Sequence, residues 1–239
     1  QRQMCIRDRA GMVLSKHSDF DFRVEEELHR RARLKMVQSL EKAGVRDPRV
    51  LAAMNSIPRH LLVAEALRHK AYSDVALPIG SGQTISAPHI VALMSERLCL
   101  EGHEAVLEIG TGSGYQCAIL SKLAERVVSI ERVPNLANDA RRALDRFGVI
   151  NAVVFLGDGT VGRPNDGPYD AILVTAAGPK VPRSLLMQLK VGGRLVGPFG
   201  LSHSQVLLEV RRTNLSNWTQ KELGDCKFVD LIGDEGWST

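Results

Sequence analysis

A regular alternation of apolar, strand-like segments with helical segments constrains the fold most, and it begins at residue 105. Strands joined by helices in this order require right-handed crossovers and a mostly parallel sheet that helices cover. We therefore expect an α/β fold with a Rossmann-like, doubly wound, mostly parallel sheet. The expected strands are Ala105–Ile109, Arg126–Ile130, Ala152–Leu156, Asp170–Thr175, Arg194–Val196 and Gln205–Val210, with a further edge strand within Lys221–Leu231. The expected helices between them are Tyr115–Ala124, Leu136–Phe147 and Ser184–Lys190.

The first hundred residues have a different texture, with helical periodicity and no alternation. Helices are expected at about Val24–Ala43, from Pro48 with Asp47 as its N-cap, at about Arg59–His69 and at Pro88–Leu98. A polar, glycine-punctuated segment separates the last two. Residues 1–20 lack periodicity and are interpreted as a poorly structured or foreign leader. We expect one domain over residues 21–239, with N-terminal helices at 21–100 and a cofactor-binding sheet at 101–239.

Composition excludes several classes of function. The net charge is +4, but residues 1–35 alone hold nine basic and six acidic residues, so the body of the chain is nearly neutral and a nucleic-acid partner is not expected. No apolar run reaches the roughly 18 residues that a membrane span needs. The four cysteines are widely spaced and no histidine pattern suggests a metal site, which is typical of a reducing cytoplasm. We expect a cytoplasmic monomer without metal.

A glycine-rich turn follows the first expected strand, in the pattern E-x-G-x-G-x-G. Glycines at a strand-to-helix junction permit a tight turn and a close approach of backbone to ligand. The dinucleotide pattern G-x-G-x-x-G is not met, because Tyr115 stands where its third glycine would be. The turn is therefore expected to bind a cofactor other than a dinucleotide, through Glu108, Gly110, Thr111, Gly112, Ser113 and Gly114.

Two further acids end the next two expected strands. Glu131 is placed to accept hydrogen bonds from ribose hydroxyls, and Asp158, followed by Gly159, to face an adenine amine. Each acid could instead be a solvated strand-end residue. Because the sequence offers no phosphate-binding lysine, a nucleoside without phosphates is favoured, and one that carries a sulfonium fits best. The expected cofactor is S-adenosyl-L-methionine.

With these residues placed, the sequence resembles the protein-L-isoaspartate O-methyltransferases, a family of Class I S-adenosylmethionine-dependent enzymes. The resemblance runs from about Arg33 to Leu231, and its most distinctive part is Gln83-Thr84-Ile85-Ser86. The other matching segments are residues 76–80, 106–116, 157–159, 169–172 and 174–177.

The resemblance implies methylation of the free α-carboxyl of L-isoaspartyl residues in damaged proteins or peptides, from which a succinimide reforms and reopens to aspartate. It places Ser86 in the active site. It places Thr84, Ile85, the glycine turn, Glu131, Asp158 and Gly159 in the cofactor pocket. Isoaspartyl proteins and peptides are then the expected partners.

Ser86 has two interpretations. An α-carboxyl titrates near pH 3.3–3.7, so it is ionised at neutral pH and needs no general base, and a serine hydroxyl is suited to orient it with one hydrogen bond. Alternatively, Ser86 is the N-cap of the helix that begins around Ala87-Pro88. The chain also departs from the family pattern at Ala64 and Asp230, where the family usually has proline.

Other functions remain open from the residues alone. One is a Class I methyltransferase acting on RNA or a small molecule, although Val174-Thr175-Ala176-Ala177 lacks the Asn/Asp-Pro-Pro-Tyr/Phe segment of amino-methylating nucleic-acid enzymes. Another is a cofactor-binding module without activity. The charge at Asp230, where the family usually has proline, leaves this alternative open.

Overall fold

The computed structural model describes residues 26–238. The leader expected at residues 1–20 therefore lies outside the described residues. The helix expected at Val24–Ala43 is helical from residue 26 to residue 42. No helix among the described residues is long and apolar enough to cross a membrane.

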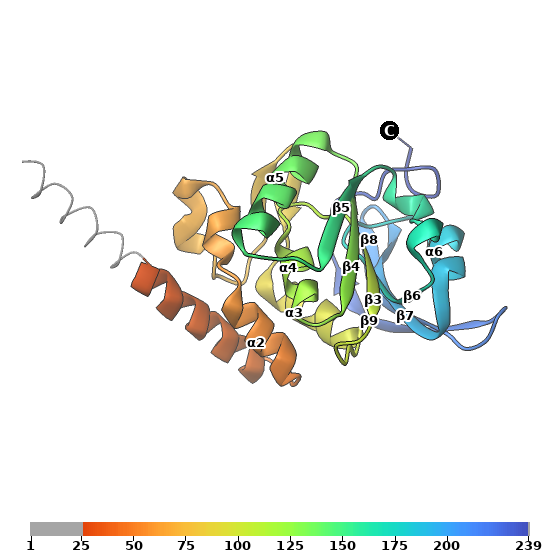
Figure 1. Ribbon diagram of the computed structural model, residues 1–239, viewed down its shortest axis with the longest axis horizontal. Helices are drawn as coiled ribbons and strands as arrows, with labels where there is room; N and C mark the ends of the chain where they lie inside the picture. Colours follow the sequence, from red (N-terminus) through yellow and green to blue (C-terminus); the bar gives the residue numbers. More distant parts are fainter. Residues whose placement is uncertain (1–25, 239) are drawn as a thin grey trace, which may run out of the picture.

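A sheet forms the centre of the molecule, with helices around it (Figure 1). It has seven strands in the order β5-β4-β3-β6-β7-β8-β9. The strands β3 to β7 pair in parallel, whereas β8 and β9 are antiparallel to their neighbours. The mostly parallel sheet confirms the expected fold class. Its strands are β3 (Ala105–Ile109), β4 (Arg126–Glu131), β5 (Ala152–Leu156), β6 (Tyr169–Val174), β7 (Leu189–Leu201), β8 (Ser204–Arg212) and β9 (Trp218–Cys226).

Helices and turns cover both faces of this sheet. Alternate residues of a strand point to opposite faces, so Val106 packs in the core shared with the N-terminal helices, whereas Leu107 packs in the core on the α6 side. Both are fully buried. The covering elements are α3 (Pro88–Arg97), α4 (Tyr115–Ser121), α5 (Pro134–Arg146) and α6 (Arg183–Gln188), with short 3₁₀ turns η3 (Gly159–Val161) and η4 (Pro164–Asp166).

Two strands differ most in extent from the prediction. The strand expected at Arg194–Val196 is the centre of the longer β7, because its later half pairs with β8 as an antiparallel hairpin from Arg194 to Leu201. The edge strand expected within Lys221–Leu231 is β9, which begins earlier and ends at Cys226. Polar, exposed residues dominate β9, so the apolar pattern that marks buried strands is missing there.

The N-terminal part holds α2 (Pro48–Ser56), two 3₁₀ helices, η1 (Arg59–Leu62) and η2 (Glu65–Lys70), and a hairpin of β1 (Leu77–Gly80) and β2 (Gln83–Ile85). Asp47 caps α2 through Arg49 N, as expected. The continuous helix expected at Arg59–His69 was wrong: Val63 and Ala64 have extended backbones that separate η1 from η2. The hairpin was not anticipated, since its strands are only four and three residues long and glycines interrupt the segment.

The chain order creates a crevice at one point of the sheet. From β3 the chain builds outward through β4 to β5, and then returns to place β6 on the other side of β3. In open α/β sheets, ligands bind at the carboxyl ends of the strands where the winding direction reverses. Here that point lies between the ends of β3 and β6, at Gly110 and Thr175.

Candidate active site

The glycine turn closes directly over the reversal point of the sheet. Gly110 has φ of 92°, and a Cβ there would lie 2.5 Å from Thr175 Oγ1. Thr175 Oγ1 donates to the carbonyl oxygen of Gly110 at 2.6 Å, which ties the end of β6 to the turn. A side chain at residue 110 would therefore meet both a strained backbone and an occupied space.

Glu131 is placed at the end of β4, opposite the same turn. Its Oε2 accepts from Gly112 N at 2.8 Å and its Oε1 from Val133 N at 2.9 Å. Both oxygens are thus held by backbone amides, and each keeps a second lone pair. Because Glu131 also lines the cavity below Gly112, it is oriented to accept from the hydroxyls of a bound ribose.

Glu108 lies beneath the turn rather than in the cavity. It is fully buried, and its Oε2 accepts from Ser129 Oγ, which in turn lies 2.5 Å from Thr111 Oγ1. Burial raises the pKa of Glu108 to about 8, and the nearby charge of Glu131 raises it slightly further. Hydrogen bonds from Ser129 and Cys117 act in the opposite direction and lower the pKa. Burial therefore favours the neutral form of this carboxyl, which supports the turn from below.

The loop after β5 contributes Gly159 to the cavity. A Cβ at Gly159 would lie 2.4 Å from Ile109 Cγ2, so only glycine fits. Asp158 does not line the cavity. Its Oδ1 accepts from Thr160 N at 2.8 Å and from Thr160 Oγ1 at 2.7 Å, and its Oδ2 accepts from Asp234 N at 2.8 Å.

The hairpin β1–β2 covers the turn from the other side and leads to Ser86. Thr84 and Ile85 line the cavities against the turn, and Ser86 is half-buried at the end of the hairpin. The capping interpretation of Ser86 is wrong, because the N-cap of α3 is Ala87 and no side chain of its own caps it. Asp74 serves the helix instead, accepting from His89 N at 2.9 Å.

Arg59 fixes the backbone at Ser86, and the sequence did not single it out. It has no exposed surface. Its Nη2 donates to the carbonyl of Ser86 at 2.7 Å, its Nε donates to the carbonyl of Ala71 at 2.7 Å, and its guanidinium lies 4.9 Å from the ring centroid of Tyr115. Within the described residues it forms no ion pair. Burial lowers the pKa of Arg59 to about 10, so the group stays charged at neutral pH. A lone Pro-Arg pair offers no local signal for such a role.

These groups line two adjoining cavities that share Thr84, Gly110, Gly112 and Thr175. Glu131 and Gly159 line the first, and Ile85, Ser86, Thr111 and Ser113 line the second. Gly114 stands behind the turn, against Ala140. The structure therefore brings together most of the expected site residues. Lining residues that the sequence did not indicate are Gln83, Ile109, Ile130, Arg132, Ala176, Val229, Leu231 and Ile232.

The chain after β9 passes over the same crevice, and we call residues 229–237 the C-terminal strap. Three hydrogen bonds hold it to two residues. Leu231 N donates to the carbonyl of Ala177 at 2.8 Å, Trp237 Nε1 donates to the same carbonyl at 2.9 Å, and Asp234 N donates to Asp158. Val229, Asp230 and Leu231 line the first cavity. Asp230, one of the two departures from the family pattern, thus faces the same cavity as Glu131.

The residues present fit a nucleoside cofactor. The backbone at Gly110 and Gly112 lies open to the cavity with no side chains between, and the acceptor oxygens of Glu131 lie beside it. The described residues hold no group of histidine, cysteine, aspartate and glutamate side chains suited to a metal ion. Fold and site together define a Class I S-adenosylmethionine-dependent methyltransferase.

Comparison with known proteins identifies the family within this class. The model of the protein-L-isoaspartate(D-aspartate) O-methyltransferase family matches residues 31–236. The protein-L-isoaspartate O-methyltransferase of Syntrophus aciditrophicus is 55% identical over 209 residues, 86% of this chain and 96% of the relative. That of Syntrophotalea carbinolica is 53% identical over 205 residues, covering 86% and 94%. The chain belongs to the protein-L-isoaspartate(D-aspartate) O-methyltransferase family.

Solved structures of the same family have a similar fold. One protein-L-isoaspartate O-methyltransferase superposes with a TM-score of 0.78 at 31% identity, covering 85% of this chain and 67% of that one. A second, from Plasmodium falciparum and described as a complex with S-adenosyl-L-homocysteine, has a TM-score of 0.74 at 26% identity and covers 84% and 98%. S-adenosyl-L-homocysteine is what remains of S-adenosylmethionine after methyl transfer, in agreement with the cofactor expected from the sequence.

Proposed function

We propose that this protein transfers a methyl group from S-adenosyl-L-methionine to the free α-carboxyl of L-isoaspartyl residues in damaged proteins and peptides. The observation that carries the proposal is the continuity of the site. The cavity at the glycine turn and Glu131 adjoins the cavity at Ser86, and Thr84 lines both. A cofactor and an acceptor carboxylate bound in these two places would be neighbours.

The residues at the site suit a nucleophile that is already ionised. An α-carboxyl titrates near pH 3.3–3.7 and carries its charge at neutral pH. The bound cofactor supplies an electrophilic methyl group on a sulfonium. The task left to the protein is to align the reacting groups and exclude water.

Ser86 is assigned to orient the substrate carboxylate. Among the described residues, its hydroxyl makes no hydrogen bond, so it is available to donate one. Arg59 fixes the carbonyl of Ser86 and thereby the position of the backbone that carries the hydroxyl. Removing the hydroxyl is therefore expected to impair alignment rather than proton transfer.

For the cofactor, we assign the backbone of Gly110 and Gly112 to the amino-acid portion, Glu131 to the ribose and the loop at Asp158-Gly159 to the adenine. Thr84, Ile85, Thr111, Ser113 and Gly114 shape the walls of the pocket, and Glu108 supports it from below. Because Asp158 is bound to Thr160 and Asp234, it acts on the adenine side through the strap and through Gly159.

We also propose that the protein works as a cytoplasmic monomer, without nucleic-acid or membrane partners. The three cysteines within the described residues are free thiols, which suits a reducing compartment.

The decisive assay uses labelled S-adenosylmethionine and two matched peptides that contain either L-isoaspartate or L-aspartate. Base-labile methyl ester on the isoaspartyl peptide alone supports the proposal. Cofactor binding without transfer to either peptide would instead indicate a cofactor-binding module without activity. Transfer to RNA would indicate a methyltransferase that acts on nucleic acid.

Ser86→Ala tests the assigned role within the same assay. We expect a ten- to hundredfold loss of kcat/KM with the cofactor affinity retained, because one hydrogen bond to a charged group contributes about 1.5–3 kcal/mol. Ser121→Ala, at the distant end of α4, is the matched control. Full activity of Ser86→Ala would refute the orienting role.

A further inference from the structure

A third cavity opens on the outer side of Ser86. It has a volume of about 260 Å³ and shares Thr84, Ser86 and Thr175 with the cavities of the site. Its other walls come from the start of α3, including His89, and from the segment after β9, including Lys227. A chain bound with its reacting carboxyl at Ser86 would leave the site through this space.

A fourth and larger cavity lies on the other side of His89. This one, which we call the N-terminal cavity, has a volume of about 570 Å³ and lies between the N-terminal helix and the segment 69–74. His89 lines both the outer cavity and the N-terminal cavity, so the two adjoin. The space is large enough for several residues of a polypeptide.

Two lysines and one aspartate are the charged residues that line the N-terminal cavity, and both lysines, Lys35 and Lys42, lie on the N-terminal helix. The acid among the lining residues is Asp74, whose Oδ1 already accepts from His89 N at 2.9 Å and lies 2.8 Å from His89 Nδ1.

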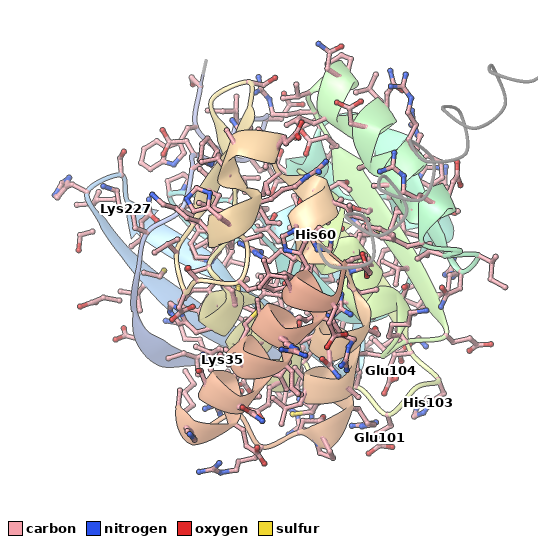
Figure 2. All side chains as sticks on the ribbon, turned by 90° about the vertical axis from the view of Figure 1, so that its left-hand side faces the viewer. Lys35, His60, Glu101, His103, Glu104 and Lys227 are labelled. Carbon is pink, nitrogen blue, oxygen red and sulfur yellow. The ribbon has the colours of Figure 1, made fainter. Side chains whose placement is uncertain are left out.

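Within residues 26–238, neither lysine of the N-terminal cavity makes an ion pair. In the outer cavity, Lys227 stands beside Asp225. Figure 2 shows Lys35 and Lys227 on the same face of the molecule, Lys35 on the N-terminal helix and Lys227 on the chain beyond the sheet.

We propose that the N-terminal cavity binds the polypeptide that flanks the isoaspartyl residue and favours acidic side chains in that flank. The inference rests on the proposed function, since it concerns the substrate of the same site. An isoaspartyl residue sits within a chain that must continue away from Ser86. A chain that leaves through the outer cavity and passes His89 would reach Lys35 and Lys42, which form no ion pair within the described residues. Acidic flanks would meet complementary charge there, and basic flanks would meet repulsion.

The expected preference is moderate, because both lysines are solvent-exposed. Exposed ion pairs change binding by about two- to fivefold for each pair. Such a preference should weaken as salt is added, since screening acts on exposed charges over about 8–10 Å at ordinary ionic strength.

The test compares three isoaspartyl peptides: one with a glutamate-rich flank, one with the same flank in lysine, and a short neutral peptide that ends close to the isoaspartyl residue. Each flank is placed on either side of the isoaspartyl residue in turn. The enzymes are the wild type, the double variant Lys35→Glu/Lys42→Glu and a control, Lys122→Glu, whose lysine lies at the end of α4 and lines none of these cavities. Thermal unfolding checks that all three are folded.

We expect the wild type and the control to have a higher kcat/KM for the acidic flank on one side, by about five- to tenfold over the basic flank. The double variant should lose or invert this preference while it methylates the short peptide as the wild type does. The inference would be overturned if the double variant changed kcat/KM equally for all three peptides, or if the kcat/KM of the wild type did not depend on flanking charge. The proposed function would stand in both cases. The inference would also be overturned if the double variant differed from the wild type only in its sedimentation behaviour. Such a result would show that a second copy of the chain occupies the cavity. Failure of the wild type to methylate even the short peptide would instead refute the proposed function.

Discussion

The two ends of the site are built in different ways. At the cofactor end, the turn from Gly110 to Gly114 is one continuous segment whose shape follows from its own residues and from the sheet beneath it. At the substrate end, Ser86 is fixed by contacts with Arg59, which lies 27 residues away in the chain. The first end is therefore sensitive to local backbone changes, and the second to the loss of side-chain contacts between distant segments.

The largest effect is expected at the cofactor end, for Gly110→Ala. The added Cβ would approach Thr175 Oγ1 to 2.5 Å on a backbone with φ of 92°, so the turn must shift away from the cofactor. We expect more than a hundredfold loss of S-adenosylmethionine affinity, measured by calorimetry. Gly157→Ala is the control, since nothing lies within 4 Å of its added Cβ. Equal losses in both variants would show that the turn does not depend on its local geometry.

Arg59→Met tests the substrate end. The change removes two hydrogen bonds of 2.7 Å, one to the buried carbonyl of Ala71 and one to the partly buried carbonyl of Ser86, each worth about 1.5–3 kcal/mol for a charged donor. We expect kcat to fall ten- to hundredfold while cofactor affinity changes little, with some loss of stability.

Arg59→Lys provides the comparison, because it keeps the charge but loses the forked geometry. We expect it to recover stability more than kcat. If kcat in the two variants followed stability alone, Arg59 would have only a structural role.

A pH effect on stability is expected from Glu108 below the turn. Its pKa is about 8 in the folded protein and 4.5 for the free group, so the folded state holds the proton more tightly. The stabilisation is complete below pH 4.5 and is lost as the pH rises through about 8, by up to about 1.4 kcal/mol per pH unit.

Urea unfolding of the wild type and Glu108→Gln at pH 6 and pH 9 measures this effect. The wild type should lose more stability between these values than the variant, whose amide does not ionise. Parallel losses in the two proteins would mean that Glu108 is ionised at neutral pH.

The smallest effect is expected for Asp230→Asn in the strap. Asp230 lines the same cavity as Glu131, so we expect its carboxylate to attract a cationic cofactor and to repel an anionic substrate. We expect the KM for an isoaspartyl peptide to fall about two- to threefold and cofactor affinity to weaken slightly, with both changes reduced by salt. An unchanged KM would show that the strap does not influence the substrate end.

The cofactor end of the site could be predicted from the sequence much better than the substrate end. The sheet and the turn were predictable because buried parallel strands are apolar and glycine-rich turns have few alternative conformations, and Glu131 followed from its place at the end of a strand. The hairpin, the break at Val63 and Ala64, and Arg59 were not predictable. They depend on tertiary contacts such as Arg59 with the carbonyls of Ala71 and Ser86, which leave no periodic pattern.

Ser86 shows the limit most clearly. Local sequence favoured a helix cap, yet Ala87 occupies the N-cap position and Asp74 binds the first turn from outside the helix. A capping residue supplied by another segment cannot be read from the residues next to the helix.

The strap gives the molecule an optical reporter. Trp237 donates its indole N–H to the carbonyl of Ala177, beside the cavity that Ala176 and Leu231 line. The other tryptophan, Trp218, lies on β9 near Arg212. In a Trp218→Phe background the remaining emission would come from the strap alone, so that quenching or a wavelength shift on adding S-adenosylhomocysteine would follow occupancy of the site in real time, without a labelled ligand.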